Sequence, residues 1–331
     1  MSLTAHQLRL FSRSVLALSE LTQTTDPDTW LSRAVSELKA LVPFDSAWWG
    51  QVEAGQPGGS AKNVMHGSLG LSPQFAEEWN TIARCDHFAR ASMEKLGQPV
   101  IYNGSDDNLI NEPAALVEFS QRHGLYHCLA ITLKFPSSGL LFFVSIYRDK
   151  PQPKFKRMDA DWLEAFSAHV LSGWERSLRQ ANHGSLQGHW DSLALANSNG
   201  RVLYIGKALS RVLDECFDNW RGTYLPDPLL PMLATRARLP HKGQGARLMV
   251  EPCGRWSSVK ISSKEDLRLS PREWSVAHLY AQGMSYKEVA RCLGVTPATV
   301  RTYLRQVYGQ LGVSNKVGLA NALRPRGVVS C

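Results

Sequence analysis

The sequence has no apolar run long enough to cross a membrane. The longest, residues 139–147, has the length of a buried strand, less than half of a bilayer span. The first 20 residues alternate polar and apolar types at helical spacing, which is unlike a signal peptide. With 331 residues, 44% hydrophobic and 20% charged, the composition is typical of a soluble globular protein of two or three domains without a membrane partner.

Paired cysteines and recognisable catalytic motifs are also absent. The six cysteines form no Cys-x-x-Cys pair, so they indicate reduced thiols in a cytoplasm rather than disulfides or a zinc site. No Gly-x-Ser-x-Gly elbow, His-Glu-x-x-His helix or paired-carboxylate motif occurs. Gly206-Lys207-Ala208 lacks the glycine spacing and the Ser or Thr of a phosphate loop. We therefore expect no enzyme activity, no metal and no cofactor.

Acidic residues are scarce at the C-terminal end of the chain. From residue 267 onward there are nine Arg and Lys but only Glu273 and Glu288, an excess of seven positive charges in a chain of net charge +8. Positive charge concentrated in this way favours a segment that binds nucleic-acid phosphates. The alternative is a small amphipathic helical bundle with a solvated charged face. Glu288 is predicted to pack or hydrogen-bond rather than to catalyse.

The same segment has residues that typically begin and end helices, at the spacing of three helices joined by tight turns. Gly283 and Gly294 suit the left-handed backbone that ends a helix. Ser285 and Thr296 suit N-cap positions, and Pro297 suits the first position of a helix, where its missing N–H costs nothing.

The third predicted helix has an apolar and a polar face. The apolar residues recur at the 3.6-residue period and are predicted to point inward: Val300, Leu304, Val307, Tyr308 and Leu311. Arg301 and Arg305 are four residues apart, so both can reach one stretch of a DNA major groove, where arginine reads guanine. The residues expected to contact DNA are Thr296, Pro297, Thr299, Arg301, Thr302 and Arg305, with Lys287, Arg291 and Lys316 at phosphates.

These landmarks, from Leu269 to Ala320, resemble the LuxR/GerE family of bacterial transcription regulators. The resemblance implies an all-α helix-turn-helix whose last long helix lies in a major groove of double-stranded DNA. Tyr303 departs from the family pattern, which commonly has His there, so one flanking contact is in doubt. Regulators of this kind gain affinity from two half-sites, so we expect a homodimer. RNA polymerase is a further candidate partner.

The first 180 residues are predicted to place helices on both sides of an antiparallel sheet, an α+β sandwich. The clearest signal is a hairpin of strands at 126–135 and 140–148. A long amphipathic helix through Trp174 closes the segment. This order resembles GAF-type sensor domains and the ligand-binding half of acyl-homoserine-lactone receptors, which belong to the same LuxR family.

Candidate ligand contacts follow from the second resemblance: Trp48, Trp49, Trp79, Asp86, Tyr102 and Tyr126. Asp86 stands where the receptors grip the ligand amide with an Asp-Pro pair, but His87 replaces the Pro. Tyr102 stands in place of a Trp, and Cys128 stands near the place of a Gly. Most of the lactone signature is therefore missing, and we expect a different ligand.

A filled core is the alternative interpretation of these residues. Aromatic side chains most often fill cores, and Asp86 could be a helix cap. Trp48 and Trp49 are neighbours on a predicted strand and must point to opposite faces, so only one of them can line a cavity.

The middle of the chain begins with a strand, an Asn-Gly turn and a strand, and a helix at Lys207–Cys216 follows. This stretch resembles the opening hairpin of PAS domains. The predicted organisation is α+β and multidomain: a GAF-like α/β sandwich that senses a ligand (1–180), a small PAS-like or connecting α+β domain (181–264), and a LuxR-type helix-turn-helix (265–331).

Together these patterns predict a transcription regulator whose N-terminal domain senses a small molecule and controls DNA binding by the C-terminal domain. One alternative is an effector-free regulator that answers to a protein partner. Another is an acyl-homoserine-lactone quorum-sensing receptor.

Overall fold

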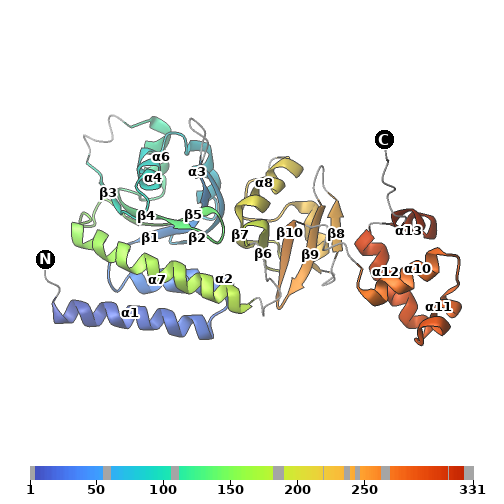
Figure 1. The fold of residues 1–331 in the computed structure, drawn as a ribbon. Helices are drawn as coiled ribbons and strands as arrows, with labels where there is room; N and C mark the ends of the chain where they lie inside the picture. Colours follow the sequence, from blue (N-terminus) through green and yellow to red (C-terminus); the bar gives the residue numbers. More distant parts are fainter. Residues whose placement is uncertain are drawn as a thin grey trace, which may run out of the picture.

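The computed structural model describes residues 4–54, 61–105, 112–181, 190–218, 220–234, 239–242, 247–261, 269–311 and 313–323. Within these residues, a sheet covered by helices is followed by a second sheet and then by a helical bundle (Figure 1). The predicted α+β fold class with an all-α C-terminal end is confirmed. The boundaries predicted at 180/181 and 264/265 stay predictions, because they border residues outside the described ranges.

The first sheet has five antiparallel strands in the order β2-β1-β5-β4-β3. Their bounds are β1 Ser46–Glu53, β2 Lys62–Leu69, β3 Val100–Asn103, β4 His127–Phe135 and β5 Leu140–Arg148. The predicted hairpin is confirmed: Phe135 pairs with Leu140, and Gly139 has the positive φ of 70° that the turn requires.

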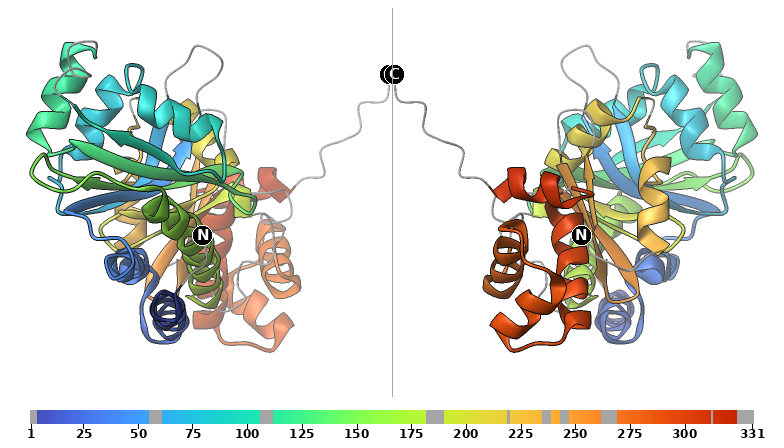
Figure 2. Two further views of the ribbon diagram at one scale, coloured as in Figure 1. Left: turned by 90° about the vertical axis from the view of Figure 1, so that its left-hand side faces the viewer. Right: turned by 90° about the vertical axis from the view of Figure 1, so that its right-hand side faces the viewer.

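Helices cover both faces of this sheet, as the two side views show (Figure 2). One face carries α2 (Pro27–Leu38) and α7 (Arg157–Ala181), against which α1 (Ala5–Thr24) packs as an outer helix. The other face carries α3 (Phe75–Ile82), α4 (His87–Glu94) and α6 (Ala114–Arg122). The sheet therefore separates two apolar cores. Because side chains alternate along a strand, Trp48 belongs to the core under α3 and α6, and Trp49 to the core under α2 and α7.

The second sheet has the order β7-β6-β10-β9-β8. Its elements are β6 Leu193–Ala196, β7 Val202–Ile205, α8 Lys207–Cys216, α9 Leu230–Ala234, β8 Leu239–Lys242, β9 Arg247–Cys253 and β10 Trp256–Ile261. The predicted hairpin and helix are confirmed. Numbered within each sheet, the strands of both follow the same order, 2-1-5-4-3.

The two sheets share a continuous core. Trp174 on α7 lies 5.4 Å from the Phe135 ring and 6.2 Å from the Tyr204 ring of β7, measured between ring centroids. Gln51 on β1 is fully buried and bonds to the β7 backbone with both ends of its amide. Its Nε2 donates to the carbonyl oxygen of Ile205 at 2.7 Å, and the Ile205 N–H donates to its Oε1 at 3.0 Å. The strand that carries Trp48 is thereby hydrogen-bonded directly to the second sheet.

Candidate functional site

Four helices form the C-terminal bundle: α10 Pro271–Ala281, α11 Tyr286–Leu293, α12 Pro297–Leu311 and α13 Lys316–Leu323. Their ends are fixed by the residues that the sequence indicated. Ser285 caps α11, accepting the Glu288 N–H at 3.4 Å, while the Glu288 carboxylate accepts the Ser285 N–H at 2.7 Å. Gly294 ends α11 at φ 65°, and Thr296 caps α12 by accepting the Thr299 N–H at 3.1 Å. Glu288 therefore has the hydrogen-bonding role that was predicted for it.

The inward face of α12 is also as predicted. Val300, Leu304 and Val307 are buried to 2% exposure or less, and Tyr308 and Leu311 pack at the edge of the same cluster. This packing orients the opposite face of the helix outward. Arg301 and Arg305 are both exposed, Arg305 on that outward face and Arg301 on its flank, and the buried Val300 and Leu304 beside them fix the orientation of the helix.

The nine residues predicted to contact DNA divide into two groups by exposure. The exposed ones are Thr296, Pro297, Arg301, Thr302, Arg305, Lys287 and Arg291, whereas Thr299 and Lys316 are half-buried. Lys316 is engaged within the bundle: its Nζ donates to the Met284 carbonyl oxygen at 3.2 Å and lies 4.3 Å from the Tyr280 ring centroid. Its charge is therefore partly directed inward, while its contact with DNA stays a prediction, as do the contacts of the other eight.

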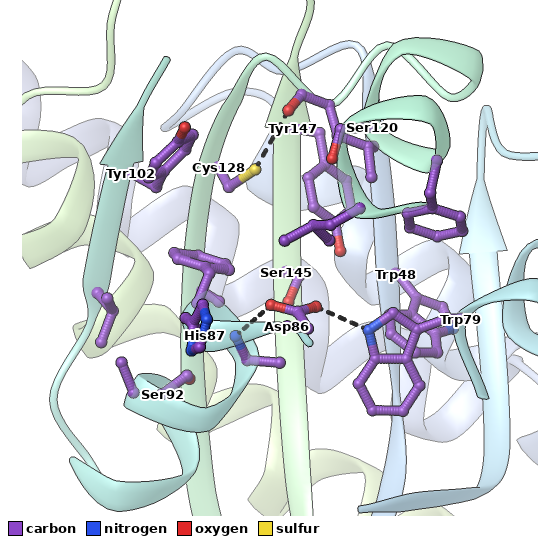
Figure 3. A pocket seen from close by; sticks show the side chains of 18 of the residues that line it. Trp48, Trp79, Asp86, His87, Ser92, Tyr102, Ser120, Cys128, Ser145 and Tyr147 are labelled. Atoms are coloured by element: carbon purple, nitrogen blue, oxygen red, sulfur yellow. Dashed lines mark hydrogen bonds between the residues drawn. The ribbon is translucent and has the colours of Figure 1, made fainter. Parts of the chain in front are cut away.

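A cavity of about 530 Å³ is the second candidate site. It lies between the first sheet and helices α3, α4 and α6 (Figure 3). Five of the six predicted ligand contacts line it: Trp48, Trp79, Asp86, Tyr102 and Tyr126. The inclusion of Trp49 was wrong, because this side chain points through the opposite face of β1 into the core under α2 and α7.

Aromatic rings pack tightly at one end of the cavity. The Trp48 ring lies edge-on to Phe75, Trp79 and Phe143 at centroid distances of 4.7 to 5.0 Å. These rings form a wall by the edge-to-face geometry that aromatic quadrupoles favour. Core filling and cavity formation thus occur together: the rings interlock with one another and leave the space beside them open.

Asp86 lies in the middle of the cavity wall and also caps a helix. Its carboxylate accepts the indole N–H of Trp79 at 2.8 Å through Oδ2 and the backbone N–H of Ala89 at 2.8 Å through Oδ1 (Figure 3). The second bond makes it the N-cap of α4. Burial raises the pKa of this carboxyl, and the hydrogen bonds oppose the rise.

Further polar groups on the cavity wall come from β4, β5 and α4. Ser92 and Thr132 share a hydrogen bond of 2.8 Å between their hydroxyl oxygens, and both are buried. Burial raises the pKa of the Cys128 thiol and of the Tyr147 hydroxyl, so both keep their protons at neutral pH. Thr132 and Tyr147 were not predicted. They could have been found from the hairpin, because Thr132 is four residues beyond Cys128 on one strand face, and Tyr147 pairs with Cys128.

Neither a metal-binding cluster nor a membrane span is found in the described ranges. No group of three or more His, Cys, Asp or Glu residues in these ranges is arranged to hold a metal ion. None of the helices described is both long and apolar enough to cross a bilayer.

Part of the chain matches known proteins in sequence. Residues 267–323 match the family described as bacterial regulatory proteins, luxR family. The transcriptional regulatory protein UhpA of Escherichia coli is 41% identical over 66 residues, which are 20% of this chain and 34% of UhpA. The probable HTH-type transcriptional regulator GfsR of Streptomyces halstedii is 27% identical over 137 residues, 38% of this chain and 54% of that protein. The chain thus covers about a third to about half of these two relatives.

The wider chain has distant structural neighbours. SdiA of Escherichia coli has 13% identity and a TM-score of 0.36, covering 94% of this chain and 96% of SdiA. The GAF domain of a two-component sensor histidine kinase from Bacillus halodurans has 15% identity and a TM-score of 0.30, covering 45% of this chain and 94% of that domain. At this level of similarity neither structure assigns a ligand or a partner.

Proposed function

We propose, from the premise that residues 267–323 are a helix-turn-helix domain of the LuxR family, that the protein is a DNA-binding transcription regulator. The observation that carries the proposal is the exposed arginine face of α12 above a fully packed core. Arg301 and Arg305 read base edges, and Lys287 and Arg291 on α11 meet phosphates. The excess positive charge of this end of the chain supplies the salt-dependent part of the affinity.

Binding to a preferred duplex and to a scrambled duplex at several salt concentrations tests this role. Arg301→Ala or Arg305→Ala should cost about 1–3 kcal/mol on the preferred duplex and relax base preference there. Lys287→Ala should weaken binding to both duplexes alike and flatten the salt slope by about one unit. If both arginine variants bind the preferred duplex like the wild type while remaining folded, α12 does not read the groove.

We also propose that the first sheet and the helices that cover it, together called the first unit, sense a small molecule. This molecule is mostly apolar and carries an N–H or O–H donor. The cavity and its aromatic wall suit such a molecule, and Asp86 is a buried acceptor within the wall. Occupancy would control DNA binding by the C-terminal domain. The alternatives are control by a protein partner without any effector, or an acyl-homoserine lactone as the molecule sensed.

Native mass spectrometry of the purified full chain tests the sensor. A retained small molecule supports it, and its mass identifies or excludes an acyl-homoserine lactone. Ser120→Trp would place a ring in the cavity from α6, whereas Glu118→Trp changes an exposed position of the same helix and serves as the control. Loss of the retained molecule in the first variant only is the expected result. If no molecule is retained by the wild type, a protein partner is favoured.

We further propose a cytoplasmic homodimer that binds two half-sites about one DNA turn apart. The exposed apolar residues Leu8 and Leu16 on α1 and Val317 on α13 are available for pairing. Light scattering with and without DNA decides the point, since a monomer in both conditions contradicts the dimer. RNA polymerase remains a candidate partner of the DNA-bound form.

A further inference from the structure

Four side chains, one from each helix of the C-terminal bundle, form a continuous stack. Lys316 on α13 lies with its Nζ 4.3 Å from the ring centroid of Tyr280 on α10. The Tyr280 ring stacks on the Tyr286 ring of α11 at a centroid distance of 5.1 Å and an angle of 13°. The guanidinium carbon of Arg301 on α12 then lies 5.4 Å from the Tyr286 ring centroid. The order is cation, ring, ring, cation.

The two rings are fixed independently of Arg301. The Tyr280 hydroxyl donates to the Tyr286 hydroxyl at 3.3 Å, and the Lys316 Nζ also donates to the Met284 carbonyl oxygen at 3.2 Å. The hydrogen bond to Tyr286 is the main reason why the pKa of Tyr280 is raised, so Tyr280 keeps the proton that it donates. Both rings are half-buried at the edge of the bundle core. Tyr286 therefore presents an aromatic face of fixed orientation to Arg301 on α12.

An exposed arginine otherwise samples many rotamers, and binding must immobilise it. Holding a rotamer-rich side chain in place before binding removes part of that entropic cost. The planar guanidinium is suited to both tasks, since it stacks on an aromatic face and keeps its N–H donors at the edge free for a base.

We propose that Tyr286, backed by Tyr280, is a positioning residue for Arg301 and thereby sets the base preference of the domain. This inference rests on the proposed DNA-binding function and deepens it, since it names a specificity residue that lies outside the recognition helix. Tyr286 acts through Arg301. Its removal should reduce discrimination at the base pair that Arg301 reads and leave binding to unrelated sequences unchanged.

The test uses the full chain and a duplex selected by the wild type from a randomised pool. Dissociation constants are measured on this duplex, on versions with single base-pair changes, and on a scrambled duplex. Tyr286→Leu should weaken binding to the selected duplex by roughly two- to tenfold, with the loss confined to the base pair at which Arg301→Ala relaxes preference. Binding to the scrambled duplex and the salt slope should not change, because no positive charge is removed.

Two further variants distinguish positioning from general stability. Tyr286→Phe keeps the π-face and should bind within about twofold of the wild type. The double variant Tyr286→Leu with Arg301→Ala should be no weaker than Arg301→Ala alone, because the two residues act as one unit. Trp274→Leu, which removes an exposed aromatic of α10 outside the stack, is the matched control and should keep full discrimination.

If Tyr286→Leu lowers the melting temperature, Tyr286→Met provides an apolar side chain of similar length without a ring, and the same losses are expected from it. If Tyr286→Leu and Tyr286→Met discriminate between base pairs like the wild type, the positioning role is overturned while the DNA-binding function stands. Additive losses in the double variant of Tyr286→Leu with Arg301→Ala overturn it in the same way. A wild-type chain that selects no duplex from the pool overturns the DNA-binding function, and the positioning role with it.

Discussion

Replacing Asp86 by Ala should destabilise the first unit through two separate hydrogen bonds. The Ala89 N–H would lose its N-cap acceptor, which costs about 1 kcal/mol. The indole N–H of Trp79, a side chain that is only 4% exposed, would lose its acceptor as well, and an unsatisfied buried donor costs about 1–3 kcal/mol. We therefore expect a loss of about 2–4 kcal/mol of unfolding free energy.

A double-mutant cycle with Trp79→Phe isolates the second bond. Trp79→Phe removes the indole N–H, so Asp86→Ala should cost less in that background, by about 1–3 kcal/mol. Urea unfolding is monitored through hydrogen exchange at amides of the first sheet, so that unfolding of this sheet is observed separately from the second sheet and the C-terminal bundle. Additive effects within about 0.5 kcal/mol would refute the bond as a source of stability.

The pH dependence of the same site has a definite sign. Because burial raises the pKa of Asp86, the folded protein holds this proton to higher pH than the unfolded chain does. Stability from the neutral carboxyl is therefore complete below the unfolded pKa of about 4 and is lost as pH rises through the folded pKa. The stability of the wild type relative to Asp86→Asn should accordingly fall as pH rises from about 4. A difference that grows with pH would contradict this.

Three more predictions follow from other contacts. Gly294→Ala places a Cβ in open space at a residue with φ 65°, so its cost should come only from the backbone conformation. We expect a loss of about 1–2 kcal/mol, measured by thermal unfolding of the C-terminal bundle. A neutral effect would contradict the left-handed cap. Gln51→Leu leaves the N–H and C=O of Ile205 unpaired and should cost about 2–4 kcal/mol of unfolding free energy. Hydrogen exchange should then show the two sheets unfolding separately. A single unchanged transition would show that the Gln51 amide does not join them. Burial, followed by the charge of Arg201, lowers the pKa of His66 to about 4, so the unfolded chain binds this proton first and stability should fall by up to about 3 kcal/mol as pH drops from 6.5 to 4. His66→Gln should flatten that decrease, and an equally steep decrease in the variant would contradict it.

Local patterns predicted the elements well. The hairpin expected at 126–135 and 140–148 is observed at His127–Phe135 and Leu140–Arg148, and α8 has both predicted bounds. In each case alternation or helical periodicity is strong and the turn residue is unambiguous. β8 was not predicted, because Leu239–Lys242 is four residues long, contains a proline and shows no alternation that would distinguish a strand.

The cavity could be predicted only in part. Both faces of β1 are buried under helices, so the strand lacks the polar alternation that would have told Trp48 from Trp49. Whether the rings close the space depends on how Phe75, Phe119 and Phe143 meet across elements far apart in the chain. The amide of Gln51 gave no signal either, since its partner is the backbone of a strand 154 residues away.

The shared core of the two sheets limits how this protein can be divided. Removing everything after residue 181 would take away Tyr204 and the Ile205 backbone, so that Trp174, Phe135 and the Gln51 amide would face water. An excised first sheet with its helices is therefore expected to aggregate. A chimera that joins this N-terminal part to another C-terminal domain would need to transfer both sheets together, with the cut ahead of α10.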